Sequence, residues 1–409
     1  MSEVSHRERE QRARAAREKR AAFGPDLDLG KYEHAVEEQG YLADLSAVPA
    51  DERQTLLDTG IVLDGTRQRS ATFILKDQSP IHFSTKQEDV EVLSLSQALK
   101  THDWLDQYLW RAIEVDADKY TAHVALEHTD GYFIRSLPGA RTTLPVQACL
   151  YLGHKKLAQR VHNVIIAEEN SELHIITGCS SHPMSTGLHL GVSEFYVKKG
   201  ARLSFTMIHN WAPGVEVRPR SAAIIEENGV FMSNYLALKP VHAIQMYPSA
   251  RCVGPNARAR FNSVLVALQG SRIDSGSRIL LDSPGSKGEI ISRTISNGGE
   301  IIARGDIQGN AVDVKGHLEC RGLILGESGM IRAIPELTGR LARVDLSHEA
   351  AVGKIAEEEV EYLMSRGLTR DQATAMIVRG FLKVDIEGLP PELDKEIQKA
   401  MEESEGELF

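Results

Sequence analysis

Three residues in the C-terminal third of the chain have side chains that bind metals or transfer protons. Cys320 lies in the stretch GHLECRGLILG, and His348 and Glu349 are adjacent in LARVDLSHEAAVGKIAEEEVEYLMSRGL. A thiolate, an imidazole and a carboxylate can together hold a transition metal or run acid–base chemistry. Taken singly, Cys320 could be a small core residue. His348 and Glu349 could stabilise the start of the acidic helix expected after them.

The spacing of the cysteines argues against a disulfide framework or a zinc finger. Cys149, Cys179, Cys252 and Cys320 lie far apart, and none belongs to a Cys-x-x-Cys pair. Isolated thiols of this kind fit a reducing compartment, so we expect a cytoplasmic protein. Cys149 and Cys252 are interpreted as structural residues, whereas Cys179, in the polar stretch TGCSSHP, is expected on an exposed loop where a thiol could react.

Signatures of several enzyme classes are missing from the sequence. The chain has no GxxxxGK(S/T) phosphate-binding loop, no GxGxxG after a strand, no HExxH and no GxSxG. A carbohydrate-processing enzyme would need a pair of carboxylates in a groove. The acidic residues of the middle region fall mostly in turns such as AEEN and LDSPG, which are typical of solvated corners.

Composition and charge exclude other classes of protein. The 409 residues are 42% hydrophobic and carry a formal net charge of −10, which argues against a nucleic-acid footprint over the whole molecule. Residues 1–22 are rich in Arg, Glu and Ala, and we interpret them as a solvated helix or frayed arm rather than a nucleic-acid or membrane contact. No apolar run is long enough for a transmembrane helix.

Short alternating strands and recurring turns dominate residues 120–341. A regular interval between turns predicts a β-solenoid, in preference to a β-sandwich, with each repeat contributing about two coils' worth of strands. Glycine and asparagine suit such corners because they tolerate positive φ. The turns that recur, at intervals of 30, 28 and 28 residues, are Asn170-Ser171, Gly200-Ala201, Asn228-Gly229 and Asn256-Ala257.

Helical patterns flank this β region on both sides. Residues 1–119 are expected to be mainly helical, with one short β stretch, RSATFILKD, and residues 342–409 are expected to be helical again. Thr369 followed by Gln372 is the signature of a capping box. The helix that it starts carries an apolar face that includes Met376, Ile377 and Phe381.

The stretch from Cys320 to Lys383, above all SHEAAVGKIAEEEVEYLMSRGLTRDQATAMIVRGF, resembles the C-terminal signature of the SufB/SufD family of the SUF iron–sulfur cluster assembly system. TGCSSHP, HNWAPG, YPSA and SRTISNGG are similar to earlier parts of the family pattern. The resemblance implies a right-handed parallel β-helix flanked by helical segments. It also implies a non-catalytic scaffold whose partner, the SufC ATPase, carries the nucleotide site and binds the C-terminal helical segment, where Met376, Ile377 and Phe381 could contribute.

Within the family, this chain is similar to SufB at its site. Cys320, His348 and Glu349 match the SufB arrangement, whereas SufD-like chains lack the cysteine and have His-Gly in place of His348-Glu349. The resemblance therefore implies a transient iron–sulfur cluster, 4Fe–4S or 2Fe–2S, held between two copies of the chain at the β-helix end. A flavin reductant, the sulfur donor and the acceptor apo-proteins stay open. The alternative is a SufD-like structural subunit without its own cluster.

Two further residues match positions that SufB is proposed to use in sulfur transfer. Cys179 matches the cysteine at which sulfur would enter, and Trp211 matches a tryptophan on the path to Cys320. SufB has a glutamine where this chain has His209. The N-terminal cysteine motif of many SufB chains is absent, since the first cysteine is Cys149. The chain thus resembles compact forms that work with SufC alone and would pair with themselves.

Overall fold

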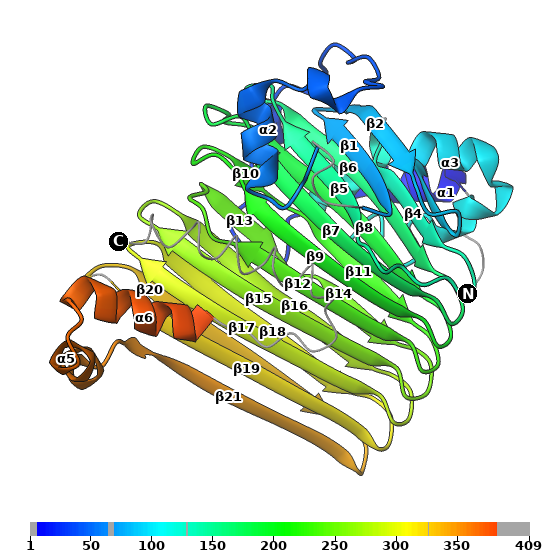
Figure 1. Cartoon of the computed structure of the whole chain (residues 1–409). Coiled ribbons are helices and arrows are strands. Elements are labelled where there is room, and N and C mark those ends of the chain that lie inside the picture. The colour runs from blue at the N-terminus through cyan, green and yellow to red at the C-terminus, as the bar shows by residue number, and fades with distance from the viewer. Residues whose placement is uncertain (1–5, 64–68, 128–129, 326, 383–409) are drawn as a thin grey trace.

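The computed structural model describes residues 6–63, 69–127, 130–325 and 327–382. The chain is mainly β, with 47% strand and 18% helix, and forms a β-solenoid of about 8 turns with helices towards both termini (Figure 1). This architecture confirms the predicted solenoid and excludes the sandwich. No helix within these residues is long and apolar enough to cross a membrane.

Two walls of mostly parallel strands enclose the core. The ten-stranded wall consists, in spatial order, of β2 (Ser79–Thr85), β1 (Ala71–Lys76), β5 (Val146–Leu152), β7 (Glu172–Ser181), β9 (Arg202–Asn210), β12 (Val230–Ala237), β15 (Arg258–Leu268), β17 (Lys287–Asn297), β19 (Val314–Ile324) and β21 (Val344–Lys354). The eleven-stranded wall contains β3 (Val90–Ser94), β4 (Tyr132–Ser136), β6 (Ala158–Ala167), β8 (Leu188–Val197), β10 (Glu216–Val217), β11 (Arg220–Ile225), β13 (Ala243–Met246), β14 (Ser249–Cys252), β16 (Arg272–Leu281), β18 (Glu300–Gly309) and β20 (Met330–Gly339).

The turn period of the sequence is the period of the coil. Glu172 pairs with Arg202, Arg202 with Val230 and Val230 with Arg258, so one repeat advances the chain by one strand in each wall. Each repeat is therefore one coil, and the expected two coils' worth of strands was wrong. The corner residues Asn170, Gly200, Asn228 and Asn256 all have positive φ, between 57° and 68°, a conformation that asparagine and glycine adopt at low cost.

The two ends of the solenoid differ. At the first end, β2 and β3 run antiparallel to their neighbours and finish the walls. At the other end, β21 pairs only with β19 and β20 only with β18, among the residues that the structure describes. Most of β21 is exposed on both faces. The C-terminal end of the solenoid therefore presents two open strand edges, which in soluble proteins are usually covered or otherwise protected.

The N-terminal region is less helical than expected for 1–119, because it supplies β1, β2 and β3 to the walls. The expected helix within 1–22 forms as α1, but it is docked rather than free: Arg9 and Arg12 each pair with an aspartate, Asp106 and Asp116, at 2.6 Å. The helical elements of this region are α1 (His6–Ala15), α2 (Ala50–Leu57), α3 (Leu95–Thr101), α4 (Lys119–Leu126) and the 3-10 turns η1 (Leu29–Lys31), η2 (Leu45–Ala47) and η3 (Asp103–Tyr108).

The C-terminal helices start later than expected for 342–409, since β21 continues the solenoid to Lys354. They are α5 (Glu357–Ser365) and α6 (Arg370–Leu382). The capping box is confirmed: the Gln372 amide donates to Thr369 Oγ1 at 3.2 Å, and the Thr369 amide donates to Gln372 Oε1 at 2.9 Å. α6 packs on the outer face of the ten-stranded wall through buried Val378 and Leu382.

Candidate functional site

Cys320 points into the solenoid from β19, the last strand but one of the ten-stranded wall. Side chains alternate between the two faces of a strand. Leu318 and Cys320, two residues apart, are both buried, whereas Arg321, the residue after Cys320, is exposed on the opposite face. The thiol residue is only 2% exposed. Its partners in register are Ser292 on β17 and Ala350 on β21, so small side chains flank it on both sides.

His348 and Glu349 lie on β21, not at the start of a helix, which excludes the helix-cap interpretation of both residues. His348 pairs with Leu318, and Glu349 pairs with Glu319. Residues paired in register point to the same face of a sheet. His348 therefore lies on the inner face with Cys320, and Glu349 lies on the outer face.

A network of charges lies on that outer face beside Glu349. The guanidinium of Arg321 is 3.7 Å from a Glu349 carboxylate oxygen and 2.6 Å from Glu319 Oε1. Arg293 also reaches Glu319, at 2.8 Å. Glu319 and Arg293 keep 13% of their side chains exposed, so this part of the network is shielded from solvent.

The environment keeps Cys320 protonated at neutral pH. Burial, and secondarily the charge of Glu319, raise the pKa of Cys320 to about 11, against a smaller lowering by Arg293. A metal would have to displace the proton, because the thiolate is the ligand. Within the described residues, no three His, Cys, Asp or Glu side chains are arranged to hold a metal ion. One chain thus brings Cys320 and His348 to one face without completing a ligand set.

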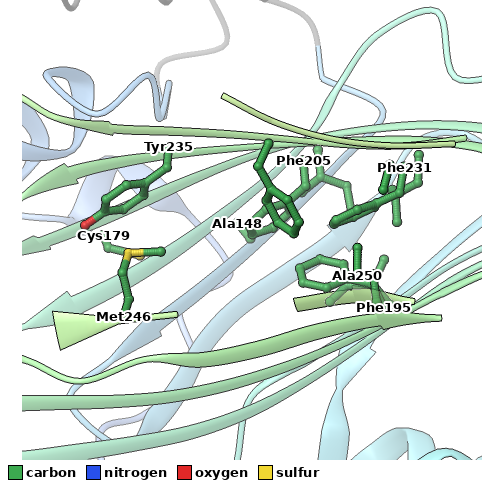
Figure 2. Close-up of a cluster of buried hydrophobic side chains, with 14 of the residues drawn as sticks. Ala148, Cys179, Phe195, Phe205, Phe231, Tyr235, Met246 and Ala250 are labelled. Atoms are coloured by element: carbon green, nitrogen blue, oxygen red, sulfur yellow. The ribbon is translucent and has the colours of Figure 1, made fainter. Parts of the chain in front are cut away.

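Cys179 lies in the core and not on the exposed loop that its polar neighbours suggested. It belongs to β7, is 0% exposed, and burial raises the pKa of its thiol far above the usual range. Figure 2 shows Cys179 beside Tyr235 and Met246, with phenylalanines filling the other end of the cluster. A buried thiol with a raised pKa is a poor nucleophile, so reaction at Cys179 would require a local opening.

Trp211 and His209 lie next to Cys179 in the same interior. His209 pairs in register with Cys179, and its Nδ1 lies 2.8 Å from the Tyr235 hydroxyl. The Trp211 ring is 5.4 Å from the His209 ring and 4.9 Å from the His189 ring. Five strand spacings separate β7 from β19, so the backbones at Cys179 and Cys320 are about 24 Å apart.

The apolar face expected on α6 is divided between packing and solvent. Phe381 packs against the outer face of the ten-stranded wall, and Ile377 is half-buried. Met376 is 51% exposed. Of these three residues, Met376 is therefore the one best placed to meet another protein.

One buried carboxylate that fastens the N-terminal region to the solenoid could not be recognised from its sequence pattern. Glu194 on β8 has a fully buried side chain, and a glutamate in an alternating run reads as a solvent-facing residue. Its carboxylate accepts hydrogen bonds of 2.6–3.3 Å from the backbone amides of Trp110, Ala112 and Ile113. Nε2 of His162 lies 2.9 Å away.

Known proteins are similar to this chain across all the residues of the candidate site. Residues 151–381 match the family model described as SUF system FeS cluster assembly, SufBD core domain. An iron–sulfur cluster assembly SufBD family protein of Archaeoglobus fulgidus is 55% identical over 358 residues, which cover 88% of this chain and 96% of that protein. A SufBD family protein of Methanothermobacter thermautotrophicus is 48% identical over 96% of this chain and 97% of its own.

A more distant relative carries a more specific name. The iron–sulfur cluster assembly protein SufB of Bacillus subtilis is 28% identical over 378 residues, 88% of this chain and 80% of that protein. The family model includes Cys179, Trp211, Cys320, His348 and Glu349 within its matched range. The chain therefore belongs to the SufBD family of the SUF iron–sulfur cluster assembly system.

Proposed function

We propose that the chain is a scaffold on which iron–sulfur clusters are built before transfer to acceptor proteins. The observation that carries this proposal is the position of Cys320, a thiol on the inner face one strand away from an open edge. Thiolates are the usual ligands of such clusters, and here the cluster, 4Fe–4S or 2Fe–2S, is the cargo. His348 and Glu349 would add weaker ligands, which suits release.

A second copy of the chain is the partner that would complete the site. The edges of β20 and β21 are open, and β21 exposes both of its faces. Pairing of two such ends about a two-fold axis would cover the edges and bring two copies of Cys320, His348 and Glu349 together. A homodimer through the solenoid end thus supplies the ligands that one chain lacks.

Energy and sulfur for cluster assembly would both come from partner proteins. ATP hydrolysis would occur on a SufC-type ATPase bound at α5 and α6, with Met376 exposed towards it, and the scaffold itself would catalyse no reaction. Sulfur from a donor would enter at Cys179 and pass Trp211 along the interior. The cysteines, all free, suit the reducing cytoplasm.

Anaerobic reconstitution with iron and sulfide tests the proposal. Wild type should bind one cluster per two chains, and Cys320→Ser should lose it. Cys252→Ser is the matched control, because Cys252 is also a buried free thiol of the core, and this variant should keep the cluster. Full cluster content in Cys320→Ser would refute the site. A protein that takes up no cluster even with the ATPase present would instead be a SufD-like structural subunit. The absorption spectra recorded during reconstitution would also reveal a bound flavin.

A further inference from the structure

The eleven-stranded wall is interrupted in two neighbouring coils. β10 and β11 are separated at Pro219, and β13 and β14 are separated at Pro248. β10 pairs with β13 and β11 with β14, so the two interruptions lie side by side. Proline has no N–H to donate and is therefore rare in central strands. The hydrogen-bonded ladder of the wall is weakest at this place.

Arginine side chains replace the missing ladder bonds on the outer side of the interruption. Nη1 of Arg218 donates to the carbonyl oxygen of Ala243 at 3.3 Å. Nη1 of Arg220 donates to the carbonyl oxygen of Gln245, also at 3.3 Å. Arg218 also pairs with Glu216, and Arg220 with Asp118, each at 2.7 Å. Side-chain contacts rather than a continuous backbone ladder therefore close this part of the wall.

A cavity of about 30 Å³ lies behind the interruption. Apolar side chains dominate its lining, which includes Phe205, Phe231, Met207 and Met246 as well as both prolines, and no charged residue contributes. A space of this volume exceeds that of one water molecule, and apolar cavities in proteins accept small neutral guests such as xenon. An ion would lose its hydration without compensation there.

The N-terminal segment crosses the outer side of the same interruption. The Phe23 ring packs edge-on against Tyr247, which lies between β13 and β14, at 4.9 Å, and under the Arg304 guanidinium at 4.3 Å. Gly24 follows with φ of +76°, and a Cβ there would come within 2.6 Å of Gln245 Cγ. The segment therefore fits closely over the place where the wall is weakest.

We propose that the cavity is a binding site for one small uncharged molecule, of the size of dioxygen or xenon, that enters through the proline interruption beneath Phe23. The lining selects against charge, the volume limits the guest to a few atoms, and the interruption beneath Phe23 provides the entrance. A guest would lie beside Tyr235, which lines the cavity and is hydrogen-bonded to His209. The cavity lies in the middle coils of the solenoid beside Cys179 (Figure 2) and apart from the proposed cluster site on β19 and β21.

Xenon titration of the full-length protein labelled at its methionine methyl groups tests the site by NMR. Met207 and Met246 line the cavity, so their methyl signals should shift, while those of exposed Met184 and Met376 should not. Ser233→Leu places a larger side chain at a lining position and should abolish the shifts, whereas Ser233→Ala should keep them. Unshifted Met207 and Met246 in wild type, or shifts that persist in folded Ser233→Leu, would overturn the site. If Ser233→Leu does not fold, the wild-type titration decides alone.

The entrance is tested by the rate at which xenon exchanges. Phe23→Ala removes the ring that covers the interruption and should speed exchange several-fold without changing which methyl groups respond. Arg20→Ala is the matched control, because Arg20 belongs to the same segment but has a side chain that is 76% exposed, and it should exchange as wild type does. Equal rates in wild type and Phe23→Ala would overturn the proposed route.

Discussion

His348 and Cys320 lie on the same face of the ten-stranded wall although they belong to different strands. His348 is in register with Leu318, two residues before Cys320, so the two side chains are diagonal neighbours whose backbones are roughly 7–8 Å apart. Glu349 is turned to the opposite face and lies near Arg321. The three residues are therefore not equivalent as ligands, and this difference can be measured.

We expect His348→Ala to lower the iron and sulfide bound after reconstitution more than Glu349→Gln does. His348 can share a metal with Cys320 without moving to the other face, whereas Glu349 must leave Arg321 and approach from another direction. Asp345→Asn is the control, because Asp345 is an exposed residue of the same strand and should be neutral. A severe loss in Glu349→Gln beside a neutral His348→Ala would contradict the assigned faces.

The carboxylate of Glu319 should add to the effect of burial in lowering the reactivity of Cys320. Its charge contributes to the raised pKa of the thiol, while Arg293 acts in the opposite sense. Glu319→Gln should lower that pKa and so raise the thiolate fraction at pH 8 about tenfold for a fall of one pKa unit. Alkylation should then be about threefold faster, because a thiolate of lower pKa is a weaker nucleophile. The measurement is the pH dependence of alkylation at Cys320, located by mass spectrometry, with wild type changing near pH 11.

The matched control is Glu289→Gln. Glu289 lies on the neighbouring strand β17, its side chain is 49% exposed, and it pairs with Arg260, so its removal should leave the alkylation profile of Cys320 unchanged. A slower reaction in Glu319→Gln than in wild type would mean that loss of the contacts to Arg293 and Arg321 outweighs loss of the charge.

The solenoid could be predicted from sequence because its corners impose a chemical requirement at a fixed interval. Asn170, Asn228 and Asn256 adopt positive φ, which few residue types tolerate, so the requirement is visible as a repeated residue. The number of coils per repeat was harder to predict. Each coil contains two strands, such as β7 in one wall and β8 in the other, and a linear pattern does not show which strands stack on each other.

The candidate site was harder to predict from the sequence than the solenoid was. β21 exposes both faces, so it lacks the alternation of apolar and polar residues by which a strand is recognised, and His348 was placed near a helix. Cys179 has polar neighbours because part of the interior is polar: Ser181 points inward and accepts a hydrogen bond from the Ala212 amide at 2.8 Å. Polarity was therefore a misleading sign of exposure.

The two faces of α6 should respond differently to substitution. Val378 is buried against the wall, and Val378→Ala should cost about 2 kcal/mol by leaving a cavity, seen as faster amide hydrogen exchange throughout α6. Met376→Asp changes an exposed side chain and should leave exchange unchanged while it weakens binding of the proposed ATPase partner. Exchange that is equally slow in Val378→Ala and wild type would contradict the docking of α6.

Glu194 should be the residue on which attachment of the N-terminal region depends most. Its buried carboxylate receives three backbone amides, and such charge-assisted bonds are individually strong. Glu194→Gln keeps the size of the side chain but replaces one carboxylate oxygen, an acceptor, with an NH2 group, a donor that would face those backbone N–H groups. We expect a loss of about 3 kcal/mol in the free energy of unfolding, the cost of leaving buried donors unpaired.

Urea unfolding and amide hydrogen exchange together test this expectation. The amides of Trp110, Ala112 and Ile113 should lose protection in Glu194→Gln before the strands of the solenoid do, because the carboxylate is their partner. Glu169→Gln is the control, since Glu169 is an exposed turn residue and its substitution should alter neither quantity. Uniform loss of protection across all strands would show instead that Glu194 supports the wall itself, and unchanged stability would show that the attachment rests on the apolar contacts around it.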